Sequence, residues 1–212
     1  MEVLKKITKS QLKAIVNDYE RLMPGWKRVA PDVLARADGP LCQCIGFESL
    51  RFGEYRPMNY VDALIAPEPD TMGAGSFFFQ IVRGSPGTLT LRTHADFCKK
   101  MLGTMEREFR PAIHGPFRAQ EVLGLCEKEA ITKGYQAYAL AALNAYFGYD
   151  DRARYWCAQF PKLVEKLAYP WEEWDIRRKT FLEKLQQWLT DGVAKAELEA
   201  NLKAERAKWG LA

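Results

Sequence analysis

The chain has 212 residues, of which 48% are hydrophobic and 12% aromatic. This composition supports a substantial core, in one large domain or in one domain with a helical extension, and it argues against disorder over most of the chain. The 31 basic and 27 acidic residues are evenly spread, with 16 and 13 in residues 1–115 and 15 and 14 in residues 116–212. Sequence-independent nucleic-acid binding needs a concentrated positive face, so we do not expect a nucleic-acid partner.

Targeting and redox signals favour the cytoplasm. No run approaches the roughly 18 apolar residues of a membrane span. The N-terminal stretch MEVLKKITKSQLK lacks the apolar centre of a signal peptide. The five cysteines form an odd set without the spacing of a disulfide framework, which predicts free thiols in a reducing compartment. We therefore expect a cytoplasmic protein without membrane contact.

The first predicted element is a helix that follows a capping box. Thr8 is the expected N-cap, and Gln11 stands three residues later. Pro24-Gly25 ends the helix. The apolar residues recur at helical spacing and predict one buried face: Leu12, Ile15, Val16, Tyr19, Leu22 and Met23.

Residues 26–92 predict four or five antiparallel strands. The strand-like runs are WKRVAPDVLARA, LCQCIGFESLRF, MNYVDALIA, SFFFQIVRG and TLTLRT. Asp38-Gly39 is typical of a hairpin turn, and the stretch Pro67–Gly75 is rich in residues that break regular structure. In the second run the apolar parity changes after Phe47, so we expect a bulge near Glu48-Ser49.

From Thr93 onward the pattern is helical. Thr93 and Asp96 form a second predicted capping box, and Pro111 stops that helix. Further helices are predicted at about 117–130, 134–147, 150–167, 171–190 and 193–208, with Pro161 inside one of them. Strands and helices are thus segregated, which predicts an α+β fold: a sheet domain over 1–115 and a helical region over 116–212 packed on it.

The segment AYALAALNAYFGYDDRARYWCAQF, residues 137–160, resembles one tetratricopeptide helical hairpin. Gly148 to Ala153 match the family's Gly-x-x-x-x-Ala turn, and Leu140-Ala141 match its Leu-small pair. Ala137, Asn144 and Cys157 depart from it, since the family has bulky aromatic residues there. The resemblance covers one hairpin and implies a protein-binding role. The N-terminal layout also resembles uncharacterised bacterial α+β domains, some of them associated with toxin–immunity systems.

Two pairs of residues, one of two cysteines and one of a histidine and a cysteine, are the candidate metal ligands. Cys42 and Cys44 share one face of a strand, and His94 and Cys98 share one face of a helix. Four such ligands could hold zinc tetrahedrally. The spacing is unlike a Cys-x-x-Cys knuckle, and free cysteines are commonly buried, so the sequence favours ordinary core cysteines and no metal.

No catalytic residue is assigned from sequence. His94 with Cys98 is a conceivable thiolate pair, and His114 lies in the loop PAIHGP. A Gly-x-Ser-x-Gly elbow is missing, and GAGSFFF lacks both the Lys-Ser/Thr and the following helix of a phosphate loop. The alternative readings are a small enzyme using His94 or Cys98 and, less favoured because of the even charge, a nucleic-acid binder; no cofactor is predicted.

The candidate binding residues are Arg51, Tyr55, Arg56 and Tyr60, around GEYRP. Arginine and tyrosine are enriched at protein interfaces, whereas a solvated sheet face is the simpler explanation. The predicted helix 171–190 adds Trp174 to a heavy apolar stripe that could meet a partner.

The last predicted helix has few large apolar residues, which are Leu198, Leu202 and Trp209, so we expect it on the outside, where it could mediate homo-oligomer contacts. Together these features predict a cytoplasmic bacterial protein-binding module, an immunity-type inhibitor or an adaptor. Its Arg/Tyr-bearing sheet edge and its Trp-rich helix would occlude a protein partner.

Overall fold

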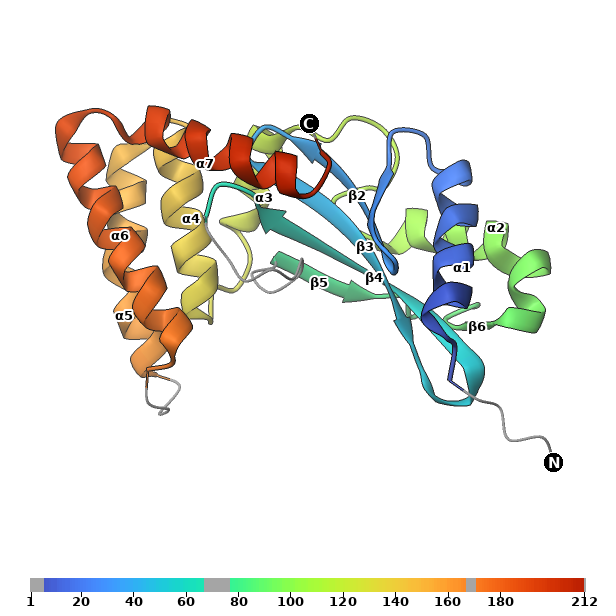
Figure 1. Ribbon diagram of the computed structural model, residues 1–212. Coiled ribbons are helices and arrows are strands. Elements are labelled where there is room, and N and C mark those ends of the chain that lie inside the picture. Colours follow the sequence, from blue (N-terminus) through green and yellow to red (C-terminus); the bar gives the residue numbers. More distant parts are fainter. Residues whose placement is uncertain (1–5, 67–76, 167–170, 212) are drawn as a thin grey trace.

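The computed structural model describes residues 6–66, 77–166 and 171–211 (Figure 1). Helix α1 (Lys9–Leu22) precedes a sheet, and helix α2 (Leu91–Glu108) follows it. The strands are β1 (Lys27–Ala30), β2 (Val33–Asp38), β3 (Leu41–Ser49), β4 (Glu54–Ala63), β5 (Phe77–Ile81) and β6 (Leu89–Thr90), with a short 3-10 helix η1 (Arg51–Gly53) after β3. The remaining helices are α3 (Ala119–Cys126), α4 (Gly134–Tyr146), α5 (Asp150–Glu165), α6 (Glu173–Asp191) and α7 (Ala194–Lys208). This order confirms the α+β prediction.

Helix α1 begins as its sequence predicts. The Thr8 side chain accepts from the Gln11 backbone N–H at 3.3 Å, and the Gln11 side chain accepts from the Thr8 N–H at 2.9 Å. This reciprocal cap satisfies two N–H groups that the first turn would leave unpaired. The helix buries its predicted apolar stripe, which includes Leu12, Ile15, Val16 and Tyr19.

The sheet is antiparallel in the order β1-β2-β3-β4-β5, and β6 pairs with the far end of β4. The run WKRVAPDVLARA makes two strands instead of one, because the chain turns at Pro31-Asp32 and pairs β1 with β2. The predicted Asp38-Gly39 turn joins β2 to β3, and Asp38 is paired with Leu41. The predicted loop Pro67–Gly75 and the glycines of GAGSFFF lie outside the described residues.

The predicted bulge at Glu48-Ser49 is wrong. Pairing between β3 and β4 runs without a shift from Leu41↔Ala63 to Ser49↔Tyr55. The apolar parity changes at Leu50 because β3 ends there and η1 turns the chain. Among the described strands, register shifts lie between β1 and β2 and between β4 and β5.

Helix α2 starts one turn earlier than predicted. Its N-cap is Thr90, and Thr93 occupies the third helical position instead of the cap. The Thr90 and Thr93 side chains each accept from the other residue's backbone N–H, at 3.2 and 3.0 Å. Thr93 is therefore the N3 residue of the capping box, the role that the sequence predicted for Asp96. The predicted strand TLTLRT is shortened to Leu89–Thr90, which pairs only with Glu54 and Tyr55.

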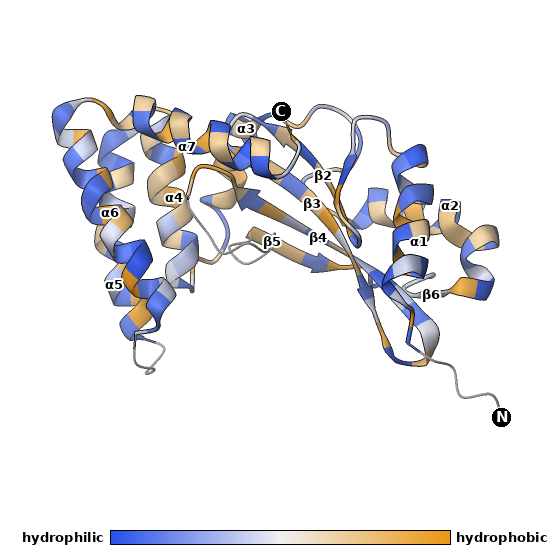
Figure 2. Cartoon of the chain, in the orientation of Figure 1, coloured by the Kyte–Doolittle hydropathy of each residue, from blue (hydrophilic) through white to orange (hydrophobic). Residues whose placement is uncertain are grey.

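The C-terminal helices follow the predicted ranges closely, and Pro161 lies inside α5. Helix α4 is the centre of this half, since every residue from Ala137 to Ala145 is buried. Figure 2 shows α4 as largely hydrophobic and α5 and α6 as more hydrophilic. A Cβ atom added at Gly134 would lie 2.6 Å from Cγ2 of Val164, so α4 and α5 need glycine at this approach. Within the described ranges, no helix has the length and apolar character to cross a bilayer.

Two hydrophobic cores lie on opposite faces of the sheet, as the alternation along β3 requires. Ile45 and Phe47 belong to the core under α1 and α2, which we call the α1–α2 core. Cys42 and Cys44 belong to the core formed with α3–α7, which we call the helical-half core. Figure 1 shows the helical half at one end of the strands and α1 and α2 at the other.

The linker between α2 and α3 is held by side chains of the sheet domain, a group that we call the carbonyl clamp: Trp26, Arg36, Gln43 and Asn59. They are buried or half-buried, and all donate to backbone carbonyls. Burial lowers the pKa of the Arg36 guanidinium to about 10. The bonds run from Asn59 Nδ2 to Arg110 O (2.8 Å), Gln43 Nε2 to Pro111 O (2.7 Å), Arg36 Nη2 to Ala112 O, Trp26 Nε1 to Ile113 O (3.1 Å) and Arg36 Nη1 to Gly115 O (2.9 Å).

Candidate functional site

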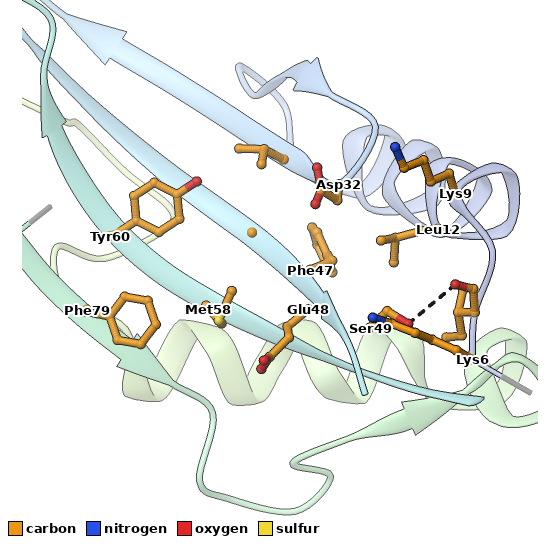
Figure 3. Close-up of a pocket in the computed structure, with 13 residues that line it drawn as sticks. Lys6, Lys9, Leu12, Asp32, Phe47, Glu48, Ser49, Met58, Tyr60 and Phe79 are labelled. Atoms are coloured by element: carbon orange, nitrogen blue, oxygen red, sulfur yellow. Dashed lines mark hydrogen bonds between the residues drawn. The ribbon is translucent and has the colours of Figure 1, made fainter. Parts of the chain in front are cut away.

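The helical half covers only part of its face of the sheet. Cys42 and Cys44 are fully buried under it. Further along β3 and β4 the same face carries Gly46 and, opposite it, Met58, and there the surface is hollowed. We call this part of the sheet the open face (Figure 3).

The hollow of the open face has a volume of about 520 Å³. Tyr60 and Met58 of β4 and Phe79 of β5 lie side by side along it in Figure 3, and Gly46 is another of its lining residues. The hollow also reaches Phe47 and Leu12 of the α1–α2 core. The remaining residues around it are Lys6, Ile7, Lys9, Asp32, Val33, Glu48 and Ser49.

The fold does not require glycine at position 46. Its φ lies outside the left-handed region, and an added Cβ would stand 3.4 Å from Cε1 of Tyr60 and 3.5 Å from Cε of Met58. An alanine would therefore fit. Glycine weakens a strand interior, and it often marks a place where a ligand or another backbone comes close. Here its missing side chain keeps the hollow open.

Phe79 is presented to the open face by an irregular strand. Between Asn59↔Gln80 and Val61↔Phe77, β5 has one residue more than β4. Phe78 absorbs the extra residue with φ +54°, a left-handed conformation that is uncommon for a bulky side chain. Phe79, the next residue, is 65% exposed. A strained residue beside an exposed aromatic ring is a reason to consider function at this strand.

Charged groups of both signs surround the hollow. Lys9 and Asp32 are exposed, and within the described ranges neither side chain makes a hydrogen bond or an ion pair. Glu48 is paired with Arg56, whose Nε donates to Glu48 Oε2 at 3.1 Å. The hollow thus has an apolar, aromatic floor and a rim whose lysines and Asp32 are available to a partner.

Tyr60 at the floor is not an acid–base group at neutral pH. It is 4% exposed. Burial, and then the nearby Cys44, raise the pKa of the Tyr60 hydroxyl well above its usual range. Burial also raises the pKa of the Cys44 thiol, with Cys42 adding to the effect. These groups remain neutral, and the open face offers shape and apolar contact more than catalysis.

A polar cluster apart from the open face connects α1, β4 and α2 on the other side of the sheet. The His94 Nδ1 lies 2.7 Å from the Tyr55 hydroxyl, and His94 Nε2 lies 3.1 Å from Asp18 Oδ2. The Tyr55 and Tyr19 hydroxyls are 3.0 Å apart. A neutral His94 protonated on Nε2 satisfies the whole chain, since it donates to Asp18 and accepts from Tyr55, which accepts from Tyr19.

This series of hydrogen-bonded side chains resembles a catalytic relay in composition, but it is not accessible to a substrate. Tyr19 and Tyr55 are fully buried, and His94 is 8% exposed. Desolvation by burial raises the pKa of both tyrosines well above their usual range. None of the four residues lines the hollow of the open face. We conclude that these hydrogen bonds connect α1 to α2 by way of Tyr55 on β4.

The predicted His94–Cys98 pair is therefore replaced by a different set of partners. Both ring nitrogens of His94 are engaged by Tyr55 and Asp18, and the Cys98 Sγ is directed to the Ala95 carbonyl at 3.9 Å. Sequence spacing suggested Cys98 because it lies one turn further along the same helix. Asp18 and Tyr55 are remote in sequence and could not be recognised.

The four-ligand zinc arrangement is wrong. Cys42 and Cys44 have Sγ atoms 3.6 Å apart in the helical-half core, whereas His94 lies in the α1–α2 layer on the other face of the sheet. All five cysteines are free thiols, as predicted. Among the described residues, no three histidine, cysteine or acidic side chains are grouped as a metal site. His114 pairs instead with Glu106, 2.7 Å away.

The five predicted binding residues do not form one surface. Tyr55 and Tyr60 are buried, 0% and 4% exposed, so neither can meet a partner as a surface side chain. Arg51 is exposed in η1, and Arg56 is half-buried against Glu48. Trp174 is half-buried on α6, in the distant helical half of Figure 1, and stacks under the Arg177 guanidinium at 4.6 Å.

The structure instead brings Gly46, Met58 and Phe79 around Tyr60, and sequence reasoning missed the first three. Two signals were available. Gly46 interrupts an otherwise β-favouring run, and FFF at 77–79 has no alternation that would bury every ring. Only the pairing of β3, β4 and β5 shows that these residues meet.

Comparison with protein-family models, curated proteins and solved structures gave no match for this chain. The tetratricopeptide resemblance therefore rests on residues 137–160 alone and stays a prediction.

Proposed function

We propose that this chain is a protein-binding module and that its binding surface is the open face of the sheet. One observation supports this above all: Phe79 is 65% exposed at the edge of a hollow of about 520 Å³ whose floor includes Met58 and Tyr60. An aromatic anchor beside a partly filled depression is typical of the centre of a protein interface.

The surroundings of the hollow fit a partner protein better than a reaction. The tyrosine and cysteine beneath it are held neutral by burial. Lys9 and Asp32 at the rim can form directed polar contacts around an apolar centre, the usual arrangement of an interface. Met58 adds a flexible, polarisable side chain that can adapt to another surface.

The role that suits such a module is that of an immunity-type inhibitor or an adaptor, which acts by covering a partner's surface. The five free thiols support a reducing compartment such as the cytoplasm. Oligomer contacts through α7 stay a prediction. Leu198 and Leu202 are buried within the chain itself, which leaves little apolar surface on this helix for a second copy.

Affinity capture from native lysate of the source cells tests the proposal. Wild-type protein should retain a stoichiometric partner, and Phe79→Ser should lose it without a change in melting temperature. Phe52→Ser is the matched control, because Phe52 is equally exposed at 67% but lies in η1, outside the hollow. Arg51→Ala/Arg56→Ala tests whether the turn after β3 contributes. Failure to recover a partner, or equal recovery with Phe79→Ser, would contradict the proposal.

A further inference from the structure

Strand β5 is the last strand in the sheet order, and no described residue pairs with its outer edge. The Val82 N–H donates inward to the Pro57 carbonyl at 3.5 Å. Because backbone groups alternate in direction along a strand, the N–H and C=O of Ile81 and Phe79 then point outward. An outer edge with unpaired backbone groups can accept another strand.

The two sides of this edge differ in chemistry. Ile81 is opposite Met58, so it shares the open face with Phe79. Gln80 lies on the other side, where its Oε1 accepts from Asn59 Nδ2 at 3.1 Å and from the Arg110 N–H at 2.7 Å. The open-face side of the edge is therefore apolar, and the Gln80 side meets the end of α2.

Cationic groups without acidic partners lie at the end of α2, beside Gln80, and directly after β5. Arg83, Arg107 and Arg110 are all exposed, and none pairs with a carboxylate in the described parts of the chain. Arg110 donates to the carbonyls of Phe109 and Arg107, and Arg107 donates to Gly103 O and Thr104 Oγ1. None of the three guanidinium groups therefore has a direct carboxylate partner among the described residues.

The carboxylate of Glu108, at the end of α2, is already occupied. It accepts from the backbone N–H of Arg83 at 2.7 Å and of Gly84 at 2.9 Å. A Cβ at Gly84 would lie 2.3 Å from Glu108 Oε1, so this glycine permits the contact. Glu108 therefore fixes the turn after β5 and is not aimed at the guanidinium groups.

We propose that the outer edge of β5 binds an extended segment of the partner protein in which apolar and acidic residues alternate. Such a strand would pair with the outward backbone groups of Phe79 and Ile81. Its apolar side chains would extend the floor of the open face, and its acidic side chains would lie beside Arg110, with Arg83 at the end of the strand. This inference rests on the proposed function and specifies the chemistry of the partner.

A second copy of this chain is a poorer occupant than an acidic strand. Pairing β5 with its own copy would add a second set of these arginines to the seam and no carboxylate to pair with them, so like charge would accumulate there. The charge of the edge thus discriminates between a foreign acidic strand and self-association.

Two synthetic peptides provide the direct test: one alternating valine and glutamate, the other alternating valine and lysine. Fluorescence polarisation should give at least about tenfold tighter binding for the glutamate peptide, weakening as salt screens the charges. Hydrogen exchange should show new protection at the Phe79 and Ile81 amides. Equal affinity for the two peptides, or binding without that protection, would overturn the inference.

Variants separate this inference from the proposed function. Arg83→Glu, at an exposed side chain without described contacts, should weaken binding of the glutamate peptide, and Arg83→Glu/Arg110→Glu should reverse the preference. Ile81→Pro removes one outward N–H but leaves Phe79 in place, with Ile81→Val as its control.

If Phe79→Ser abolishes capture of the cellular partner while Ile81→Pro and Arg83→Glu do not, the open face binds protein but strand addition is wrong. Concentration-dependent dimerisation lost in Ile81→Pro would also overturn it in favour of self-pairing.

Discussion

Ile45 and Gly46 are neighbours on β3, yet they belong to surfaces with opposite roles. Ile45 is fully buried in the α1–α2 core, beneath helices and the clamped linker. Gly46 lies in the hollow of the open face, where an alanine would fit without strain. The covered face uses its side chains to hold other parts of the chain. On the open face, by contrast, Gly46 is a glycine that the fold does not need. This is expected where something other than stability determines the residue.

The largest effect is expected from Ile45→Ala. Truncating a fully buried isoleucine should lower the free energy of unfolding by about 2 to 5 kcal/mol, because contacts are lost and a cavity remains. Urea unfolding followed by circular dichroism measures it. A loss below about 1 kcal/mol would show that the covered face is more loosely packed than its burial indicates.

Asn59→Leu should be the next most damaging change, because it removes one member of the carbonyl clamp. The Arg110 carbonyl would lose its donor, and a buried unsatisfied polar group costs about 1 to 3 kcal/mol. Hydrogen exchange should rise across the linker as well as near Asn59. If exchange stays unchanged between α2 and α3, the clamp does not fix the linker.

Tyr19→Phe should cost about 0.5 to 1.5 kcal/mol at neutral pH, the usual contribution of one hydrogen bond. Its pH dependence is more specific. The pKa of Tyr19 is raised in the folded state, so its stabilising contribution is present below the unfolded value, about 10, and is lost as the pH rises above it. Wild-type stability should fall above about pH 10, and more gently in Tyr19→Phe. Denaturation midpoints measured from pH 7 to 11 should diverge in that way; parallel curves would contradict the assignment.

The smallest effect on stability is expected at Gly46. Gly46→Ala should be neutral or stabilise by up to about 1 kcal/mol, because alanine loses less backbone entropy on folding. Gly46→Leu should instead fill the hollow and lower affinity for the partner or for the glutamate peptide. A stability loss in Gly46→Ala comparable to that in Ile45→Ala would remove the distinction between the two faces.

Local signals were sufficient for much of the fold. The Thr8–Gln11 cap, the Asp38-Gly39 turn and the five C-terminal helices depend on residues close in sequence, and each was predictable. The N-cap at Thr90 was missed because Thr90 and Thr93 can each serve as an N-cap. Only the observed start of the helix decides between the two residues.

The candidate site was less accessible to sequence reasoning. Arginine and tyrosine near a turn are typical of interfaces, but Tyr55 turns inward because His94 and Tyr19 supply its hydroxyl with buried partners. The open face depends on which residues lie opposite one another, such as Gly46 and Met58. It also depends on a bulge that aims Phe79, and neither feature has a periodic signature.

The carbonyl clamp has a consequence for how this molecule can vary. Its acceptors are backbone carbonyls, which every amino acid supplies, so the path of residues 110–115 is encoded mainly in the sheet and not in the linker itself. The side chains of the exposed linker residues are therefore free to change while the route stays fixed. A linker of this kind can diverge in sequence without becoming a hinge, and homologous chains would be aligned more reliably on the four donors than on the segment they hold.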